Sequence, residues 1–305
     1  MQVLVTGGTG FIGRHLVPQL VESGATVTLM LLPGMEDSSK LPSPLASLRS
    51  QLEVVYADLR NYNLTVRAVR DAAPDCVFHL AAVGVADPFL SPYLAVRHNL
   101  IGTINLLRAC FESSIVDSKC EQVIIARTPG ELSFQNVYAA SKAAAWIFCQ
   151  MYAQTNGWPI VGGMIYQAYG PWQSSHTLIQ AAIKAALDGD DFPMTSGQQK
   201  RDWIYARDVA SGFILAMAVD LPPGETFELG HGKVTSVEKV VKMVYELVGL
   251  GGKPIIGALP DRPGEIPIQV ANSERTFTLL RWNPSVELEV GLQLTIQHAI
   301  DHNQV

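Results

Sequence analysis

Residues 3–13 read VLVTGGTGFIG: a short apolar run, a glycine-rich turn and the start of a helical pattern. In such a turn Gly7 permits the tight bend, Gly10 lets the backbone approach a pyrophosphate, and Gly13 lets helix and strand pack closely. The pyrophosphate would lie at the helix N-terminus, where N–H groups and the helix dipole favour negative charge. A structural turn without a ligand has a similar composition, but the strand-turn-helix context that the motif needs is present. We therefore expect Gly7, Gly10, Phe11, Ile12 and Gly13 to bind a dinucleotide.

Strand-like and helical patterns alternate after this turn. Apolar, β-rich runs occupy residues 25–32, 52–56, 76–80 and 123–126, and helical spacing covers residues 11–23 and 99–111. Near-continuous apolar strands separated by helices indicate a parallel sheet that is covered on both faces. The expected fold is α/β, a Rossmann-type doubly wound parallel sheet with a smaller C-terminal substrate-binding lobe.

The second half of the chain has a different pattern. Helices are expected at residues 177–187, 208–219 and 236–248, separated by segments that contain Pro and Gly. We assign residues 1–170 to the NAD(P)-binding domain, with residues 203–230 returning to it, and residues 171–202 and 231–305 to the substrate-binding lobe. The Ser- and Pro-rich segment 35–50 is expected to be a loop.

Composition narrows the class of protein. The 305 residues are 48% hydrophobic and 16% charged, with a formal net charge of -6. A weakly acidic chain with no Lys/Arg cluster is a poor candidate for binding nucleic acid or a membrane surface. The four cysteines form no CxxC pair, no spacing suggests a metal site, and no apolar run reaches about 18 residues. We therefore expect a cytoplasmic enzyme without a metal.

Tyr138 and Lys142 are four residues apart, so on a helix they share a face. A tyrosine with a pKa near 10 is a poor base, but a neighbouring cation favours its phenolate. Such a pair can take a proton from a carbinol while a nicotinamide cofactor accepts hydride, or act in reverse. The same spacing arises by chance on helix surfaces, but together with the glycine turn it predicts a catalytic pair.

The sequence does not decide between NAD and NADP. Residues 29–33, where the second strand ends, hold neither a carboxylate for a ribose hydroxyl nor an Arg for a 2′-phosphate. Arg14 is a candidate for holding a 2′-phosphate, although a solvated surface Arg is the simpler interpretation. Glu36 and Asp37 are candidates for a displaced ribose contact. NAD is the expected cofactor, with NADP as the alternative.

The chain as a whole resembles the extended short-chain dehydrogenases/reductases, the NAD-dependent epimerase/dehydratase family that modifies sugar nucleotides. The resemblance spans nearly the whole chain, with its motifs in the right order. Besides the glycine turn and the Tyr138–Lys142 pair, it rests on residues 58–60, 79–82, 99–107, 169–171, 201–210, 262–265 and 280–284.

The resemblance implies further cofactor contacts. Asp58 and Leu59 would lie beside the adenine, Ala81 and Ala82 would line the cofactor, and Asn99 would support it. Lys142 would hold the nicotinamide ribose. His79 is expected to be a structural or cofactor-lining residue rather than a proton shuttle.

The family also uses a Ser or Thr hydroxyl at the end of the fifth strand. Here Thr128 is the candidate and Ser133 the reserve, although Thr128 would also suit a turn before proline. The 4,6-dehydratases need an adjacent Asp and Glu, and only Glu131 follows Thr128, in a different register. This departure disfavours a dehydratase.

The family's substrate contacts carry over to the later segments. Gln167 replaces the Asn that contacts the substrate phosphate, and Arg201 and Arg262 are the candidates for chelating a diphosphate. Trp203 and Tyr205 are expected to be core residues. Helices around residues 91–111 and 138–153, with apolar positions such as Trp146, Ile147 and Met151, would pair with a second subunit in a homodimer.

The leading hypothesis is hydride transfer on a nucleotide-linked sugar, by a 4-epimerase or a 4-keto reductase. A 4,6-dehydratase is the alternative within the enzyme class. A cofactor-binding protein with a degraded active site is the alternative from outside it, motivated by the unusual residues 127–129.

Overall fold

The computed structural model describes residues 1–35, 41–85, 87, 89–112, 119–262 and 264–302. The chain divides into two compact units, each containing residues from separate parts of the sequence. The first comprises residues 1–164 and 210–227, and the second comprises residues 165–209 and 228–305. The first unit ends six residues before the expected boundary at residue 170, and the later segment that it includes is shorter than residues 203–230.

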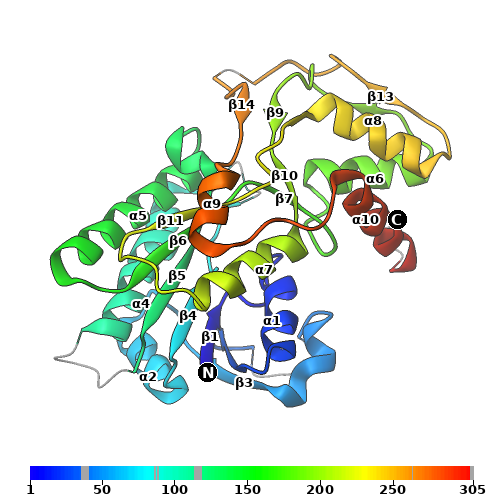
Figure 1. Ribbon diagram of the computed structural model, residues 1–305. Helices are drawn as coiled ribbons and strands as arrows, with labels where there is room; N and C mark the ends of the chain where they lie inside the picture. The colour runs from blue at the N-terminus through cyan, green and yellow to red at the C-terminus, as the bar shows by residue number, and fades with distance from the viewer. Residues whose placement is uncertain (36–40, 86, 88, 113–118, 263, 303–305) are drawn as a thin grey trace. The chain divides into compact units, whose positions relative to one another are not determined.

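A seven-stranded sheet forms the centre of the first unit (Figure 1). Its strand order is β11-β6-β5-β4-β1-β2-β3, and the pairings from β6 through β3 are parallel. The strands are β1 (Gln2–Thr6), β2 (Thr26–Leu31), β3 (Leu52–Tyr56), β4 (Cys76–His79), β5 (Gln122–Arg127), β6 (Ile160–Ile165) and β11 (Thr226–Leu229). Because β1 is central, Leu4 and Val5 are fully buried. The expected Rossmann-type sheet is confirmed.

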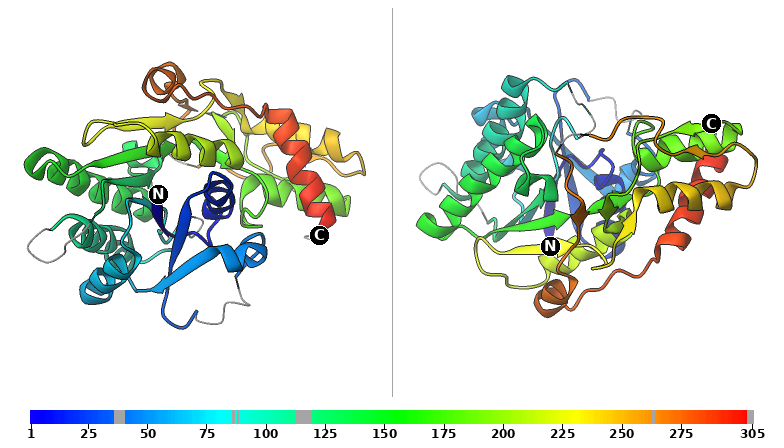
Figure 2. Two further views of the ribbon diagram at one scale, coloured as in Figure 1. Left: turned by 60° about the horizontal axis from the view of Figure 1, so that its bottom comes forward. Right: turned by 90° about the horizontal axis from the view of Figure 1, so that it is seen from above.

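Helices cover both faces of this sheet (Figures 1 and 2). They are α1 (Gly13–Glu22), α2 (Tyr62–Ala72), α3 (Pro92–Ala95), α4 (Gly102–Phe111), α5 (Val137–Asn156) and α7 (Ala206–Met217). Asn61 caps α2 by accepting a hydrogen bond from Leu64 N at 3.2 Å. A π-helical segment, η3 (Val96–Ile101), joins α3 to α4, and such segments often mark functional positions.

A late stretch of the chain completes the first unit. Phe213 of α7 packs edge-to-face against Phe78 of β4 and Phe227 of β11, with ring centroids 6.0 Å apart in each pair. A Cβ on Gly163 of β6 would lie 2.5 Å from the Phe213 ring and 2.9 Å from the Phe227 ring. The glycine in β6 therefore makes room for these two aromatic rings.

The second unit has its own core. It contains α6 (Leu178–Asp188), α8 (Val237–Val248), α9 (Ser273–Leu280), α10 (Leu288–Asp301) and the short strands β7 (Gln167–Tyr169), β8 (Phe192–Pro193), β9 (Lys200–Arg201), β10 (Trp203–Tyr205), β12 (Thr235–Ser236), β13 (Pro254–Ile255) and β14 (Ile268–Gln269). Val237, Val240, Val241 and Val244 give α8 one buried apolar face, as helical spacing requires. The expected helices at residues 177–187, 208–219 and 236–248 are confirmed to within two residues.

Two sequence expectations are wrong. Segment 35–50 is not entirely a loop, because Leu45–Gln51 form a 3₁₀ helix, η2, before β3. Trp146 is not an exposed interface residue but is 5% exposed, because its ring packs beneath the guanidinium of Arg127 at 4.1 Å. In the described part of the chain, no helix combines the length and the apolar character needed to span a membrane.

Candidate functional site

The glycine turn lies between β1 and α1. Gly7 has a φ of +72°, and a Cβ there would lie 2.5 Å from the backbone N of Ala81. A Cβ on Gly13 would lie 2.4 Å from the Gly8 oxygen, whereas a Cβ on Gly10 would meet only the Gly7 oxygen, at 3.2 Å. Gly7 and Gly13 are therefore required by the protein's own packing. At Gly10 no side chain of the protein covers the backbone, so a ligand could approach it closely.

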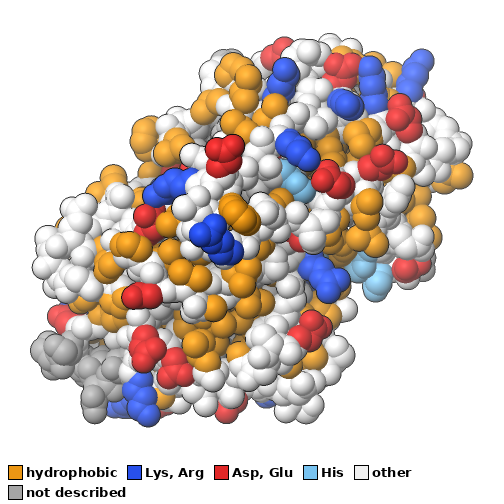
Figure 3. Space-filling view, viewed as in Figure 1, with side chains coloured by type: hydrophobic (Ala, Val, Ile, Leu, Met, Phe, Trp, Pro, Cys, Tyr) orange, Lys and Arg blue, Asp and Glu red, His pale blue; other side chains and the backbone are white. Residues whose placement is uncertain are grey.

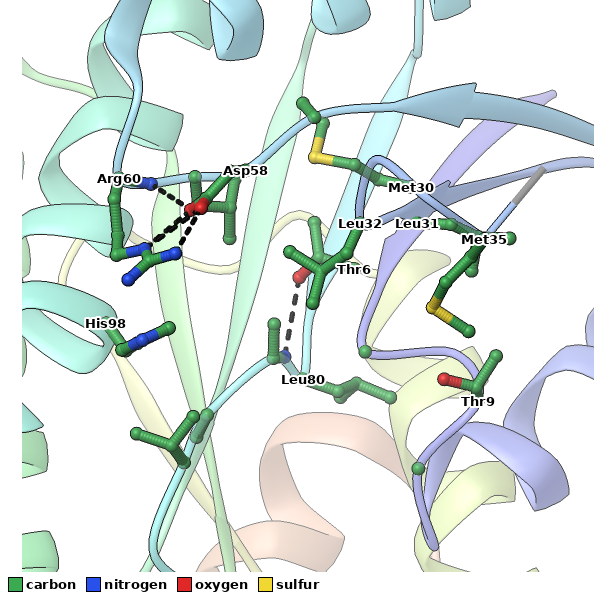
Figure 4. A pocket seen from close by; sticks show the side chains of 17 residues that line it. Thr6, Thr9, Met30, Leu31, Leu32, Met35, Asp58, Arg60, Leu80 and His98 are labelled. Atoms are coloured by element: carbon green, nitrogen blue, oxygen red, sulfur yellow. Dashed lines mark hydrogen bonds and ion pairs between the residues drawn. The ribbon is translucent and has the colours of Figure 1, made fainter. Parts of the chain in front are cut away.

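A cavity of about 310 Å³ opens above this turn in the first unit (Figure 4). Gly7, Gly10, Asp58, Leu59, Ala81 and Ala82, all expected cofactor residues, line it together with Thr6, Thr9, Met30, Leu31, Leu32, Met35, Ala57, Arg60, Leu80, Val83 and His98. Its wall thus combines the turn with the ends of β1, β2, β3 and β4. Phe11, Ile12 and Gly13 belong to the turn but not to the cavity wall.

Asp58 and Arg60 form a charged group at one end of the cavity (Figure 4). The Arg60 Nε donates hydrogen bonds to the two Asp58 carboxylate oxygens at 2.9 and 3.0 Å, and the Arg60 backbone N–H donates to the carboxylate at 2.9 Å. Hydrogen bonding from the Arg60 side chain lowers the pKa of Asp58. Asp58 is therefore an anionic acceptor whose orientation is fixed.

The end of β2 contributes only apolar side chains to the cavity, from Met30, Leu31 and Leu32. Arg14, a candidate for a phosphate contact, donates from Nε to the Ser43 oxygen at 2.6 Å and is half-buried. Glu36 and Asp37, the displaced candidates, lie outside the described residues.

Tyr138 and Lys142 both lie in the first two turns of α5, where Asn136 caps the helix by accepting from Ala139 N at 2.8 Å. Lys142 is 4% exposed and Tyr138 is half-buried. The hydroxyl of Ser141, between them in the sequence, donates to the backbone carbonyl oxygen of Tyr138 at 2.8 Å and accepts from Asn99 Nδ2 at 2.9 Å. Ser141 thereby ties the first two turns of α5 to Asn99.

Asn99, in the π-helical segment, links this helix to the cavity. Its side chain donates to the Val83 oxygen at 3.0 Å and accepts from the Val83 N–H at 2.9 Å, and Val83 lines the cavity. Asn99 is 1% exposed. It joins α5 to the cavity wall without itself lining the cavity.

Burial dominates the electrostatics of the pair. It raises the pKa of Tyr138, and the negative charge of Glu131 raises it further. Burial also lowers the pKa of Lys142. In the protein alone, the Tyr138 pKa is therefore not lowered, because burial and the charge of Glu131 both disfavour the phenolate.

Thr128 lies where β5 ends, directly before a short 3₁₀ helix, η4 (Pro129–Leu132). Its Oγ1 accepts from Gly130 N at 3.4 Å, and this leaves the hydroxyl proton available for another oxygen. A Cβ on Gly130 would lie 3.7 Å from Thr128 Oγ1 and 3.4 Å from Ala139 Cβ, so the hydroxyl lies near the start of α5. Ser133 Oγ instead donates to the Gly130 oxygen at 3.1 Å.

Glu131 is committed to the protein itself. It is 3% exposed, its Oε2 lies 2.8 Å from Arg127 Nη2, and its Oε1 accepts from the Thr128 N–H at 3.1 Å. The carboxylate therefore has partners for both oxygens before any ligand is considered.

His79 is a buried structural residue. Its Nδ1 lies 2.7 Å from Thr6 Oγ1 and its Nε2 lies 2.9 Å from Thr103 Oγ1. Since the Thr103 hydroxyl donates to the Asn99 oxygen at 2.7 Å, we assign the ring proton to Nε2. Burial lowers the His79 pKa to about 3, so the ring is neutral at physiological pH.

The second unit has a cavity of about 290 Å³, and all three expected substrate residues, Gln167, Arg201 and Arg262, line it. Arg201 Nη2 donates to Glu265 Oε1 at 2.9 Å, and its Nη1 donates to the Ile266 oxygen at 2.9 Å. The remaining wall is mostly apolar: Leu178, Phe192, Pro193, Met194, Trp203, Val237 and Leu259, with Thr195, Gln199 and Glu265. Trp203 and Tyr205 are buried, as expected.

The charge pairs that Arg60, Glu265, Arg127 and Glu131 form were not predicted from the sequence. Arg60 and Glu265 each follow an expected site residue by two or three positions and carry the opposite charge to it, which is a usable signal. Arg127 and Glu131 gave no such signal, because a charge at the end of an apolar strand is typical of a solvated turn. In the described residues, no group of three or more His, Cys, Asp or Glu side chains could hold a metal.

On the face shown in Figure 3, basic and acidic side chains are interspersed, and no patch of a single charge dominates it. The formal net charge of -6 is likewise small for 305 residues. Comparisons with known proteins show the family to which this chain belongs. Residues 3–230 match the model of the NAD dependent epimerase/dehydratase family. The UDP-glucose 4-epimerase of Halalkalibacterium halodurans is 27% identical over 336 residues, which cover 98% of this chain and 94% of that protein. The dTDP-glucose 4,6-dehydratase of Xanthomonas campestris pv. campestris (strain B100) is 26% identical, with 96% and 91% covered.

Solved structures of two relatives show the same fold. UDP-glucose 4-epimerase with UDP-glucose, from Thermotoga maritima, has a TM-score of 0.85 and 25% identity, with 99% of this chain and 100% of that chain covered. The UDP-glucose 4-epimerase of Thermus thermophilus in complex with NAD has a TM-score of 0.81 and 27% identity, with 98% of each chain covered. The resemblance inferred from the sequence is confirmed.

Proposed function

Because the chain belongs to the NAD dependent epimerase/dehydratase family, we propose that it catalyses NAD-dependent hydride transfer on a nucleotide-linked sugar, as a 4-epimerase or a 4-keto reductase. The observation that carries this proposal is the connection of α5, the helix that carries Tyr138 and Lys142, through Ser141 and Asn99 to the wall of the cavity above the glycine turn.

The cavity of the first unit has the features that NAD needs. Gly10 leaves its backbone open, and the first N–H groups of α1 lie at the turn, where a pyrophosphate is stabilised. Asp58 and Leu59 would hold the adenine end, and Ala81 and Ala82 would flank the rest. Bound NAD would supply the hydride-accepting and hydride-donating chemistry. The apolar end of β2 offers no cation for a 2′-phosphate, and this favours NAD over NADP.

Tyr138 is the proton-transferring group. Its phenolate takes the proton from the sugar hydroxyl when the carbon is oxidised, and its phenol returns a proton when the ketone is reduced. Because burial and Glu131 raise its pKa in the protein alone, phenolate formation depends on the cation of Lys142 and on the positive charge of oxidised nicotinamide. Lys142 also holds the nicotinamide ribose.

Thr128 supplies the hydrogen bond to the reacting oxygen of the sugar. Its hydroxyl accepts from Gly130 N and keeps its own proton for donation. Ser133 is a weaker candidate because its hydroxyl already donates to the Gly130 oxygen.

A 4,6-dehydratase remains the alternative, since some relatives have that activity. Water elimination needs an acid and a base beside the sugar. Glu131, the candidate in this loop, is 3% exposed and bound to Arg127 and the Thr128 N–H. Its position favours epimerisation or reduction over elimination.

The second unit binds the nucleotide. Arg201 and Arg262 supply cations for a diphosphate, and Gln167 supplies an amide to the same cavity. The apolar remainder of the cavity suits a base and a ribose.

The protein acts as a homodimer in the cytoplasm. Support for the dimer comes from apolar side chains exposed along α3, η3 and α5: Tyr93, Leu94, Val96, Ile101, Ile147 and Phe148, which are 39% to 66% exposed. A surface of this kind on a monomer marks an interaction site.

Mass spectrometry of gently denatured protein tests the cofactor first. Released NAD favours an epimerase, which keeps its cofactor through turnover, and binding only on addition favours a reductase. Failure to bind NAD or NADP would refute the proposal.

Turnover is then measured with UDP-glucose and UDP-galactose in the wild type, Tyr138→Phe and Tyr152→Phe. Tyr152 lies on the same helix and stacks on Trp158, so its variant is the matched control. We expect Tyr138→Phe to lose about 100- to 10,000-fold in kcat while still binding NAD. A cofactor-binding protein without activity would show no turnover in any of the three.

A further inference from the structure

A buried ion pair lies beneath the proposed catalytic residues. Arg127 is the last residue of β5 and Glu131 is in η4, and they are 8% and 3% exposed. Arg127 Nη2 lies 2.8 Å from Glu131 Oε2, and Arg127 Nε donates to the same oxygen at 2.9 Å. This is a two-nitrogen contact of the kind that fixes side-chain geometry.

Three further elements surround the Arg127 side chain. It lies 4.1 Å from the ring centroid of Trp146 on α5, and its Nη1 donates to Thr226 Oγ1 on β11 at 2.7 Å. On β6, a Cβ at Gly162 would lie 2.5 Å from Arg127 Cδ and 2.8 Å from the Trp146 ring. Only a glycine at position 162 leaves space for both side chains. The interior of the first unit is therefore arranged to accommodate this arginine.

Glu131 connects the pair to Thr128. While one carboxylate oxygen binds Arg127, the other accepts from the Thr128 N–H at 3.1 Å, and the Thr128 side chain accepts from Gly130 N. The Glu131 bond to the Thr128 N–H is one half of a capping box, and its other half is donated by the Glu131 backbone N–H to the Thr128 side chain, so the backbone and the hydroxyl of Thr128 are both held. Without the Arg127 guanidinium, the carboxylate would be a buried, uncompensated charge.

The two charges also act on the catalytic helix. Burial raises the pKa of Tyr138, and the charge of Glu131 adds to this rise. Burial lowers the pKa of Lys142; Glu131 opposes this lowering and Arg127 adds to it. The other titratable groups nearby are Cys149 on α5, whose burial raises its pKa to about 12, and the neutral His79 on β4. Glu131 is thus the negative charge acting on the phenol.

Stability alone is a poor explanation for such a pair. Moving two charges out of water costs several kcal/mol each, and apolar residues of similar volume are often as stabilising or more so. A role in holding nearby groups accounts for its position.

We propose that Arg127 and Glu131 are positioning residues for the reaction: they hold the Thr128 hydroxyl, and with Trp146 they fix the charge environment of Tyr138 and Lys142. This inference rests on the proposed function, because it assigns the pair to the same site. It adds two residues that never touch the substrate.

The test replaces both charges at once. Arg127→Met/Glu131→Leu keeps the volume and leaves no single buried charge, so the protein is expected to fold. The matched control is Arg108→Met/Glu112→Gln, which removes another Arg–Glu pair at the same spacing, on the surface of α4. With UDP-glucose and UDP-galactose, the first variant should lose about 10- to 100-fold in kcat with KM changed less than threefold. The control should match the wild type. A folded Arg127→Met/Glu131→Leu variant with wild-type kcat would overturn the proposal.

Glu131→Gln removes the negative charge, and its amide oxygen can still accept from the Thr128 N–H. Because this change also takes the carboxylate away from the buried Arg127 guanidinium, thermal unfolding of the variant is measured beside the titration, and Arg127→Met/Glu131→Leu serves as the second variant that lacks the Glu131 charge. Removing the negative charge favours the phenolate, so Tyr138 should titrate at lower pH than in the wild type. The 295 nm absorbance between pH 6 and 11 with NAD present, corrected with the Tyr138→Phe variant of each background, measures this directly. An unchanged titration refutes the electrostatic part, even if the double variant fails to fold. If wild-type protein turns over neither UDP-hexose but the titration still moves, 4-epimerase activity on UDP-hexoses is refuted, whereas the electrostatic effect of Glu131 on Tyr138 stands.

Discussion

Replacing Gly10 with alanine separates the cofactor site from the fold. In the protein itself the new Cβ meets only the Gly7 oxygen, at 3.2 Å, so a shift of a few tenths of an ångström accommodates it. The position has no positive φ. We therefore expect the free energy of unfolding to change by less than about 0.5 kcal/mol, as at sites away from packed features.

The same methyl group would project toward a bound pyrophosphate. Filling a close-packed contact with one extra methyl group costs about 1 to 3 kcal/mol, which corresponds to an increase in the Kd for NAD of about 5- to 150-fold. Titration calorimetry with NAD and urea unfolding without it measure the two quantities on the same protein.

Gly13→Ala is the comparison. There the Cβ would lie 2.4 to 2.6 Å from three backbone atoms of Gly7 and Gly8, so the turn itself must open. This variant should lose both stability and NAD binding. If Gly10→Ala binds NAD as tightly as the wild type, the pyrophosphate does not lie against this turn, and our placement of the cofactor is wrong.

Three further predictions concern other parts of the molecule. Arg262→Gln should weaken UDP binding by at least about tenfold, or about 1.4 kcal/mol, without changing Tm, as calorimetry and thermal unfolding would show; unchanged binding would remove Arg262 from the nucleotide site. For His79, the pKa of about 3 in the folded protein lies below the value near 6.5 in the unfolded chain. As the pH falls, the unfolded chain therefore binds the proton first. The free energy of unfolding should fall by about 1.4 kcal/mol per pH unit between these two pKa values. Urea unfolding of His79→Asn at pH 4 to 7 should show a shallower pH dependence, and an equal slope would contradict it. Ile147→Asp, at a position 63% exposed on α5, should convert a dimer to a monomer in light scattering, whereas a variant that stays dimeric would place the interface elsewhere.

The sequence predicts the parts of the site that depend on local spacing. The turn at residues 7–13 and the pair Tyr138 and Lys142 are encoded within one turn or one helix, so their geometry follows from glycine's conformational freedom and from helical periodicity. The family resemblance grouped Gln167, Arg201 and Arg262 at the substrate end. In the structure these three residues line one cavity of the second unit.

Contacts between distant strands and helices could not be predicted in this way. Trp146 looks like an interface residue on its own helix, and its burial depends on contacts from elsewhere in the chain, among them Arg127 of β5 and Gly162 of β6. Likewise Asn99 carries no sign that a π-helical segment directs it to Val83 and Ser141. The raised pKa of Tyr138 in the protein alone could not be predicted for the same reason, because its main cause is burial, which is a property of the folded chain.

The first unit also has a consequence for synthesis on the ribosome. Residues 1–164 emerge first, yet β11, which lies beside β6, and the ring of Phe213, which packs on Phe78, come from residues 213–229. Until that stretch leaves the exit tunnel, the nascent sheet has an uncovered edge at β6 and an exposed aromatic surface, the features that make nascent chains prone to aggregate. A chain that is released early, at residue 209, should therefore need chaperones, although its cofactor turn is already complete.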